Sequence, residues 1–358
     1  MRKTYIDNTR WITVVLVVFY HVIYIFNGVT KYGIIGPFSK SQPQDTYQYI
    51  VYPWFMLLLF VISGMCARFE LERRDVRQFI RNRTVKYLVP SSIGLIVFGW
   101  VLGYYNILIG GGFDTMGSVP KPVLFLIMAV SGSGPLWYIQ MLWLFSVILV
   151  LIRKFEKDRL YEKCAKANVP ILLCLTVLIY FSAQILNTPM IVVYRFWIYG
   201  MGFLTGYFVL SHDEVMEKVG RSWVLLTALA VISCIVFTVM YRGQSYPDHE
   251  VLDTVVCNIY AWTGTLGMLA FMKRWGDFDN GFSRWMSRKS WGLYVFHYLM
   301  IAVSGWYLHK LVPPLTPFVV YVIVTICAFA GAFLLYEIMS RIPVIRWCVL
   351  GIRKEKRA

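Results

Sequence analysis

Apolar residues along this chain gather into long, almost uncharged runs, and the charged residues gather between them. Ten runs are long enough, or nearly so, to cross a hydrocarbon layer ~30 Å thick as helices. They cover residues 11–26, 50–67, 87–108, 136–152, 169–186, 192–210, 223–241, 255–272, 291–308 and 318–338. A shorter apolar stretch, 123–130, is interpreted as interfacial or re-entrant. The pattern predicts an all-α, polytopic membrane protein with about ten transmembrane helices.

The composition agrees with that prediction. Hydrophobic residues make up 58% of the chain and charged residues 15%, against ~45–50% and ~25% in a typical soluble domain. A net charge of +16 would suggest a nucleic-acid partner in a soluble protein. Here the positive charges are interpreted as loop residues that face anionic lipid, so we expect a lipid bilayer and no nucleic acid as partner.

The positive charges also predict the orientation. Of the 35 Lys and Arg residues, 29 lie in the N-terminal segment and in every second segment after it, and 6 lie in the intervening segments. Such asymmetry places both termini in the cytoplasm and requires an even number of spans. The first helix is expected to be retained, because Arg10 abuts its apolar run and no small-x-small cleavage sequence follows. We expect one transmembrane domain over residues 1–341 and a basic cytoplasmic tail over residues 342–358.

The seven cysteines do not suggest a metal site or a disulfide framework. None forms a Cys-x-x-Cys pair, and most fall in apolar runs. They are therefore interpreted as small core residues, and no metal is expected.

The first apolar run contains two ionisable residues, Arg10 at its start and His21 in its middle. They are eleven positions apart, so both side chains lie within about 20° of one helix face and ~16 Å apart along the axis. With Arg10 at a membrane surface, His21 would lie near the midplane, where ionisable residues are usually functional. The alternative is an Arg10 that extends to the surface and a His21 that only hydrogen-bonds between helices. Both interpretations stay open on this pattern alone.

A second histidine, His297, lies at a similar depth in the ninth run, which suggests a polar cavity shared with His21. A basic segment before the third run contains Arg83 and Lys86, three residues apart and so on one helix face. Together with Arg81, they could bind a phosphorylated cofactor. The alternative is an ordinary positive cytoplasmic loop.

Two polar residues sit inside other runs. Gln140, one turn into the fourth run, could hydrogen-bond within the helix bundle. Arg195, in the outer half of the sixth run, could extend to the surface or bind an anionic group.

Motifs of hydrolases, ATPases and metalloproteases are absent from the sequence. Two alternatives to an enzyme remain. Ten spans with intramembrane histidines would also suit a proton-coupled transporter or flippase of a polar or glycan-related solute, and helix breaks at Gly200, Gly202 and Gly206 or at Gly264 and Gly267 would favour it. A structural subunit of a glycan-assembly complex would not need the spacing of Arg10 and His21.

Four sequence segments, in order along the chain, resemble the integral-membrane acyltransferase 3 family. They are Arg10 to His21 (Arg-x10-His), Leu59-Phe-Val-Ile-Ser-Gly64, the basic run from Phe79 to Pro90, and Ser290 to His297. Lys86 stands where the family usually has arginine.

The resemblance implies a membrane O-acyltransferase over residues 1–341, in a bacterial cell membrane. It implies transfer of an acyl group, commonly acetyl, from cytoplasmic acyl-coenzyme A to a hydroxyl of a carbohydrate or glycolipid acceptor. His21, Arg10 and His297 are then the catalytic candidates, with His21 as general base or acyl carrier. Arg83, Lys86 and Arg81 are the candidates for holding the donor's phosphates.

Overall fold

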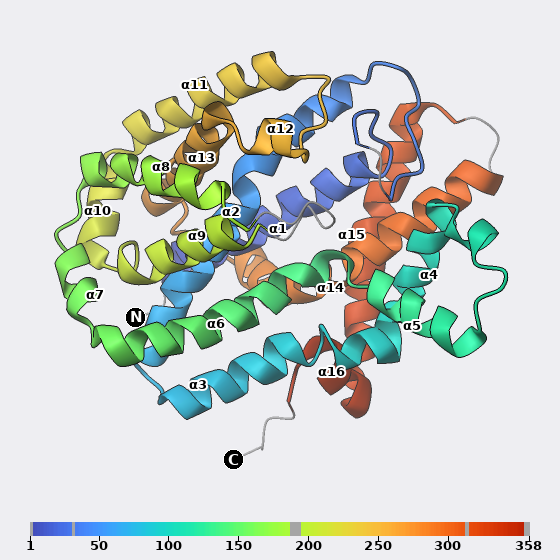
Figure 1. The fold of residues 1–358 in the computed structure, drawn as a ribbon, viewed down its shortest axis with the longest axis horizontal. Helices are drawn as coiled ribbons and strands as arrows, with labels where there is room; N and C mark the ends of the chain where they lie inside the picture. Colours follow the sequence, from blue (N-terminus) through green and yellow to red (C-terminus); the bar gives the residue numbers. More distant parts are fainter. Residues whose placement is uncertain (1–2, 31–32, 187–194, 312–314, 354–358) are drawn as a thin grey trace. The chain divides into compact units, whose positions relative to one another are not determined.

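The computed structural model describes residues 3–30, 33–186, 195–311 and 315–353. In this part of the chain every regular element is a helix, which confirms the all-α prediction (Figure 1). The α-helices are α1 (Thr4–Tyr24), α2 (Thr46–Leu71), α3 (Val76–Arg83), α4 (Trp100–Ile109), α5 (Lys121–Ser131), α6 (Trp137–Glu156), α7 (Arg159–Cys164), α8 (Val169–Ala183), α9 (Phe196–Phe208), α10 (Asp213–Arg221), α11 (Trp223–Tyr241), α12 (His249–Leu252), α13 (Val255–Trp275), α14 (Gly281–Leu311), α15 (Pro317–Arg341) and α16 (Pro343–Leu350).

Among the described residues, six helical segments are long and apolar enough to cross a membrane. They are Thr4–Tyr24, Pro43–Leu71, Gly134–Glu156, Trp223–Tyr241, Val255–Trp275 and Pro317–Arg341. Three shorter apolar helical segments, Leu95–Ile109, Lys121–Ser131 and Val169–Ala183, coincide with further predicted runs or with the predicted interfacial stretch. The count of ten spans and the cytoplasmic position of the termini stay predictions. Residues 192–194 of the sixth predicted run and residues 354–358 of the predicted tail lie outside the described residues.

The third predicted run, 87–108, is not one continuous α-helix. A π-helical turn, Thr84–Leu88, leads into a break around Pro90, and a second π-helical turn, Leu95–Gly99, precedes α4. Proline has no backbone N–H to continue the helix and its ring clashes with the preceding turn, so the break follows from the sequence. Hydropathy alone measures the length of a run and does not detect such a break.

The chain divides into two compact units. Unit 1 comprises residues 1–16, 46–80 and 144–287, and unit 2 comprises residues 17–45, 81–143 and 288–358. The division falls inside α1, α3, α6 and α14, so each of these helices contributes residues to both units.

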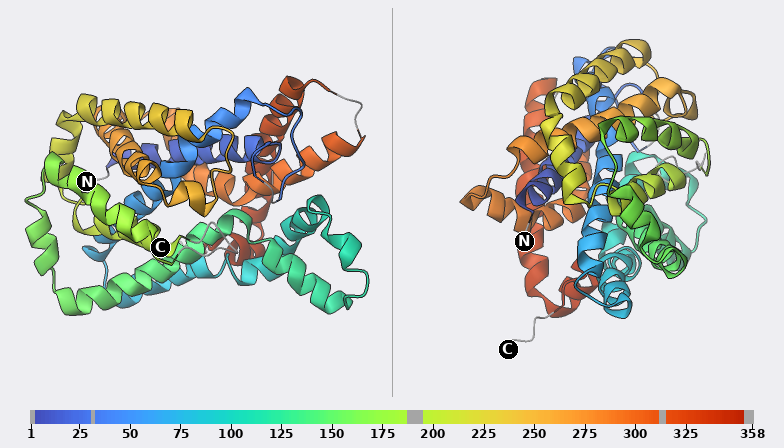
Figure 2. Two further views of the ribbon diagram at one scale, coloured as in Figure 1. Left: turned by 45° about the horizontal axis from the view of Figure 1, so that its top comes forward. Right: turned by 90° about the vertical axis from the view of Figure 1, so that its left-hand side faces the viewer.

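Unit 1 is built on two close helix pairs, α2 with α9 and α11 with α13 (Figures 1 and 2). Gly202 packs on Leu57 and Gly206 on the Val61 backbone, so α2 and α9 run parallel. Small residues allow helix backbones this close approach. Both α9 and α13 continue through their glycines without a break, so these glycines serve packing.

Gly64, the last residue of the second family-like segment, is expected to tolerate no larger side chain. A Cβ at this position would lie 1.9 Å from the Phe203 carbonyl oxygen, so α2 and α9 would have to separate. Gly64→Ala should therefore destabilise the protein by roughly 1–3 kcal/mol or more. The thermal unfolding midpoint of the purified protein in detergent would measure the loss. Gly281→Ala is the control, since a Cβ there meets nothing within 4 Å; equal midpoints for the two variants would refute the packing argument.

Unit 2 contains the hairpin of α4 and α5, which lie side by side in both views of Figure 2. The residues predicted as a tail begin with α16, whose Cys348, Val349 and Leu350 are buried. The Trp291 indole of α14 donates to the Leu350 carbonyl oxygen at 3.0 Å. The described part of this segment is thus a packed element of unit 2.

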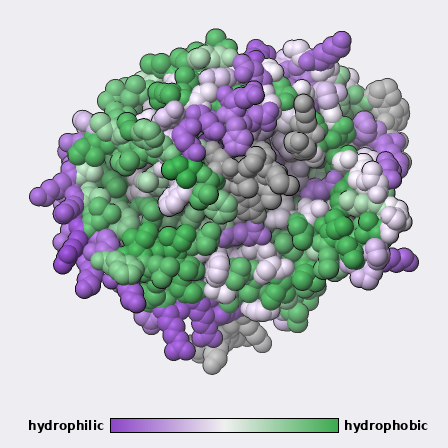
Figure 3. All heavy atoms as spheres, in the orientation of Figure 1, coloured by the Kyte–Doolittle hydropathy of each residue, from purple (hydrophilic) through white to green (hydrophobic). Residues whose placement is uncertain are grey.

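Several helices present apolar side chains outward. Only 11% of the most apolar part of α11 and 22% of that of α15 is buried, which is typical of helices that face lipid. Figure 3 shows hydrophobic residues over α8 and hydrophilic residues over α12. The prediction that the cysteines are small core residues is correct for Cys257 and Cys348 and wrong for Cys174, which is exposed; the other four are half-buried. An apolar run does not reveal which of its faces is buried.

Candidate functional site

Two histidine side chains meet inside unit 2. His21 of α1 and His297 of α14 are 276 residues apart in sequence, and the Nε2 atom of His297 lies 3.1 Å from the Nδ1 atom of His21. The ring centroids are 5.0 Å apart. The sequence predicted similar depths and a shared polar cavity; the structure joins the two rings directly.

Backbone carbonyls determine which nitrogens carry protons in this pair. The Nδ1 atom of His297 lies 3.0 Å from the Leu293 oxygen and 2.9 Å from the Tyr294 oxygen. Since a carbonyl oxygen only accepts, this Nδ1 must carry the hydrogen, and in the neutral ring Nε2 is an acceptor.

The same reasoning applies to His21. Its Nδ1 atom lies 3.0 Å from the Val17 carbonyl oxygen, so Nδ1–H donates both to this carbonyl and to Nε2 of His297. The Nε2 atom of His21 is then left with a lone pair and the role of a base. His21 is partly exposed whereas His297 is fully buried, so His21 is the member of the pair with accessible surface.

Aromatic rings surround His21. The Tyr298 and Tyr20 rings meet it edge-on, with centroids 4.9 and 5.0 Å away, and the Tyr24 ring follows at 6.3 Å. Such edge-on contacts hold the imidazole in place. Sequence reasoning missed all three, because tyrosine in an apolar run gives no sign of which helix face it occupies.

A basic cluster lies at the other end of the same stretch of α14. The Arg83 guanidinium and the Lys86 ammonium are 5.2 and 5.8 Å from the Tyr87 ring, and Lys86 is also 5.6 Å from the Trp291 ring. Lys86 is exposed and Arg83 is buried. Trp291 precedes His297 by six residues, a helical rise of ~9 Å. Arg81 is exposed, and the structure assigns it no contact with the cluster.

Arg10 lies in the part of α1 that belongs to unit 1. Its guanidinium is 3.4 Å from an Asp7 carboxylate oxygen and 2.9 Å from the Cys66 sulfur. Asp7 and Cys66 line an open cavity of about 390 Å³ in unit 1. The family-like arginine therefore stands beside a cavity large enough for part of a small molecule.

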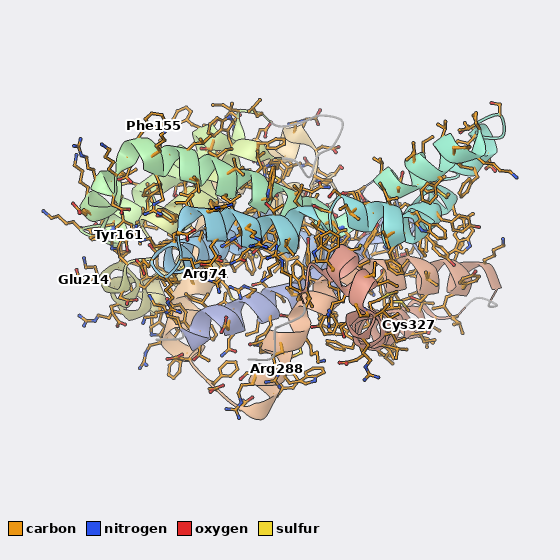
Figure 4. All side chains as sticks on the ribbon, turned by 90° about the horizontal axis from the view of Figure 1, so that it is seen from below. Arg74, Phe155, Tyr161, Glu214, Arg288 and Cys327 are labelled. Carbon is orange, nitrogen blue, oxygen red and sulfur yellow. The ribbon has the colours of Figure 1, made fainter. Side chains whose placement is uncertain are left out.

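Charged and aromatic side chains line this cavity. They are Lys3, Asp7, Phe69, Glu72, Arg73, Tyr161, His212 and Asp213. The Arg68 guanidinium and the His212 ring lie 3.6 and 3.9 Å from the Tyr161 ring centroid, and so must occupy its opposite faces. Figure 4 places Tyr161 at the same end of unit 1 as Arg74 and Glu214. Burial lowers the pKa of His212, which favours a neutral ring beside Arg68 at neutral pH.

Gln140 has a structural partner. Its amide donates to the Ser91 carbonyl oxygen at 3.1 Å, in the break that follows Pro90. The prediction that Gln140 hydrogen-bonds within the bundle is thus confirmed, and the bond secures an irregular segment of backbone.

The comparisons with known proteins agree with these observations. The acyltransferase 3 family, described as an acyltransferase domain, matches residues 3–337. The chain belongs to this family and is a membrane acyltransferase. Searches of curated proteins and of solved structures find no match. The family match makes the chain an enzyme rather than a transporter or a purely structural subunit, and α9 and α13 are unbroken at the glycines that could have favoured a carrier.

Proposed function

We propose that this enzyme transfers an acyl group, acetyl in the first instance, from acyl-coenzyme A to a hydroxyl of a carbohydrate or glycolipid acceptor. The observation that carries the proposal is the hydrogen bond between His21 and His297, which leaves Nε2 of His21 as an accessible base. The proposed setting is a bacterial cell membrane that the chain crosses several times, with both termini in the cytoplasm.

The cations of unit 2 would hold the donor. Lys86 is exposed beside Trp291, and Arg81 is exposed on the same basic segment. Phosphate groups favour such cations. The long, thin pantetheine arm would then extend along α14 toward His297 and His21. Arg83 is buried against Tyr87, so its proposed part is to orient this cluster.

The acyl transfer would use one base. Nε2 of His21 takes the proton of the acceptor hydroxyl while the hydroxyl oxygen bonds to the thioester carbonyl carbon. The carbon–sulfur bond then breaks, and the leaving thiolate takes the proton back from His21, which gives the ester and free coenzyme A. In the alternative, Nε2 attacks the thioester first and an acyl-histidine passes the group to the acceptor.

Loss of the exposed cations should weaken donor binding. Lys86→Gln, alone or with Arg81→Gln, is expected to raise KM for acetyl-coenzyme A about tenfold with little change in kcat, because one charge-assisted hydrogen bond is worth ~1.5–3 kcal/mol. Steady-state kinetics in detergent would measure it. Arg77→Gln, an exposed cation of α3, is the control and should leave KM unchanged. An unchanged KM in the Lys86 and Arg81 variants would exclude both from the donor site.

Label transfer tests the function itself. Membranes with and without the protein receive coenzyme A carrying a labelled acetyl group, and label is followed into extracted glycan, lipid and protein. Protein-dependent label in glycan or glycolipid is the expected result and begins to identify the acceptor. If neither acetyl- nor succinyl-coenzyme A gives any labelled product, and the purified protein binds no coenzyme A, the proposed donor is wrong.

A further inference from the structure

A buried cation stands at the start of α9. The Arg195 side chain is only 3% exposed, so it does not extend to the surface, which was one of its two interpretations from sequence. Its Nη2 donates to the Leu252 carbonyl oxygen at 3.3 Å, and it hydrogen-bonds the Tyr199 side chain. The Nε–H group has no partner. Both oxygens that accept hydrogen bonds from Arg195 belong to neutral groups.

No carboxylate of the described residues forms a direct ion pair with this guanidinium, although Asp253 lies near enough to act on Cys257 together with Arg195. Among the described residues Arg195 forms no ion pair, and residues 187–194 contain neither Asp nor Glu. Asp253 follows Leu252 in sequence, but its carboxylate pairs with His249 at 2.9 Å. A buried charge without a counter-charge is costly, and a guanidinium with an unpaired edge is a ready receptor for a planar anion.

Asn258, in the first turn of α13, adds a second incomplete group. It is 1% exposed, and its Nδ2 donates to the Leu252 and Thr254 oxygens at 3.0 and 2.8 Å. These two bonds fix the amide orientation, so the unpartnered atom is the Oδ1 acceptor. Since Arg195 and Asn258 share the Leu252 oxygen, their donor nitrogens are at most about 6 Å apart, the sum of 3.3 and 3.0 Å.

Gln48, in the first turn of α2, is the third such group. It is fully buried, and neither of its amide atoms has a partner. Two residues further on, the Ile50 carbonyl accepts the Tyr260 hydroxyl, and Tyr260 follows Asn258 by two residues. Gln48 shares this level with Asn258, but it lies about 120–180° round α2 from Trp54, Leu57 and Val61, which contact α13 and α9, so it is not part of a site with Arg195.

We propose that Arg195 and Asn258 form a buried binding site for an anionic group carried on a hydroxylated molecule. The anion, a carboxylate or a phosphate, pairs with the unpaired edge of Arg195. A hydroxyl of the same molecule donates to Oδ1 of Asn258. This is the chemistry of a sugar acid or a sugar phosphate. The site stands independently of the proposed function.

Binding to the purified protein in detergent tests the site without any donor. Glucuronate and inorganic phosphate are the two anionic probes, glucose is the neutral analogue, and sodium chloride matches the ionic strength. We expect one of the two anions to bind saturably, by calorimetry and as a rise in the thermal unfolding midpoint, while glucose and chloride do not. Preference for glucuronate would identify a carboxylate site and preference for phosphate a phosphate site.

Variants locate the binding. Arg195→Gln should weaken binding of the preferred anion at least tenfold, and Arg195→Lys should weaken this binding less. Asn258→Leu should weaken the binding of glucuronate more than that of phosphate, because only glucuronate carries sugar hydroxyls. Arg242→Gln, an exposed arginine at the end of α11, is the matched control and should bind as wild type does.

Two outcomes would overturn the proposal: no saturable anion binding by the wild-type protein, or equal binding by Arg195→Gln. If Arg195→Gln does not fold, the wild-type titrations and Asn258→Leu decide. Acyl transfer to a neutral acceptor would continue in either case, so failure of this site is distinguishable from failure of the proposed function.

Discussion

Replacing His21 with glutamine is expected to lower the rate of acyl transfer about 100- to 10,000-fold, because a positioned general base contributes ~10²–10⁴. Glutamine approximates the size of the imidazole but cannot take a proton. Nε2 of His21 is the only imidazole nitrogen of the pair that is not engaged by a carbonyl or by the other ring. The initial rate of label transfer from acetyl-coenzyme A would measure the loss, with the thermal unfolding midpoint as the check on folding.

His309→Gln is the matched control, since His309 is exposed near the end of α14; its rate should equal that of wild type. Retention of more than a tenth of the wild-type rate by folded His21→Gln would remove His21 from the mechanism. The same assay separates the two chemical routes. Acyl label that stays on wild-type protein without acceptor, and is absent from His21→Ala, would establish the acyl-histidine route.

His297→Leu should lower kcat roughly 10- to 100-fold. The substitution removes the acceptor of the His21 Nδ1–H bond, and an unsatisfied buried donor costs ~1–3 kcal/mol. We expect the His21 ring then to change tautomer or rotate, as when the orienting residue of a catalytic triad is lost. His297→Gln retains a carbonyl oxygen that can accept, so it should recover part of the rate. Donor KM should not change in either variant.

Nitrogen-15 NMR of labelled histidine gives a second measurement. Its result would not change in the His297 variants if the role of His297 were merely structural. In the wild-type protein His21 should show a protonated Nδ1 and an unprotonated Nε2, and His297→Leu should disturb this pattern. Equal rates for the leucine and glutamine variants, with the same His21 spectrum as wild type, would show that His297 only fills space.

Sequence reasoning predicted part of this site. The apolar run and the 11-residue spacing predicted that Arg10 and His21 share one helix, and α1 (Thr4–Tyr24) confirms it. The similar depth of His297 suggested a shared cavity, but only the packing of α1 on α14 could bring two rings 276 residues apart into contact. Cys66 was interpreted as a core residue because it lies in an apolar run; its contact with Arg10 depends on the rotation of α2, which hydropathy does not specify.

The fold was predictable to a similar degree. The helical class follows from the long uncharged runs, because a segment inside a membrane must form its backbone hydrogen bonds within itself. The proline at position 90 predicts the break, but nothing in the sequence predicts that Gln140 lies beside it. The exposure of Lys86 and the burial of Arg83 could not be foreseen, because a π-helical turn between them changes the register that an ideal α-helix would give.

The two imidazoles share one local feature: each Nδ1 hydrogen-bonds a carbonyl one turn earlier in its own helix, Val17 for His21 and Leu293 for His297. The helices themselves therefore determine which nitrogens of the two rings carry protons. No loop and no bound acceptor is needed to establish this. An enzyme organised in this way can exchange its surface loops while the reacting group keeps its orientation. Chimeras that graft loops between relatives should accordingly change which hydroxyl is acylated before they change how fast the thioester is consumed.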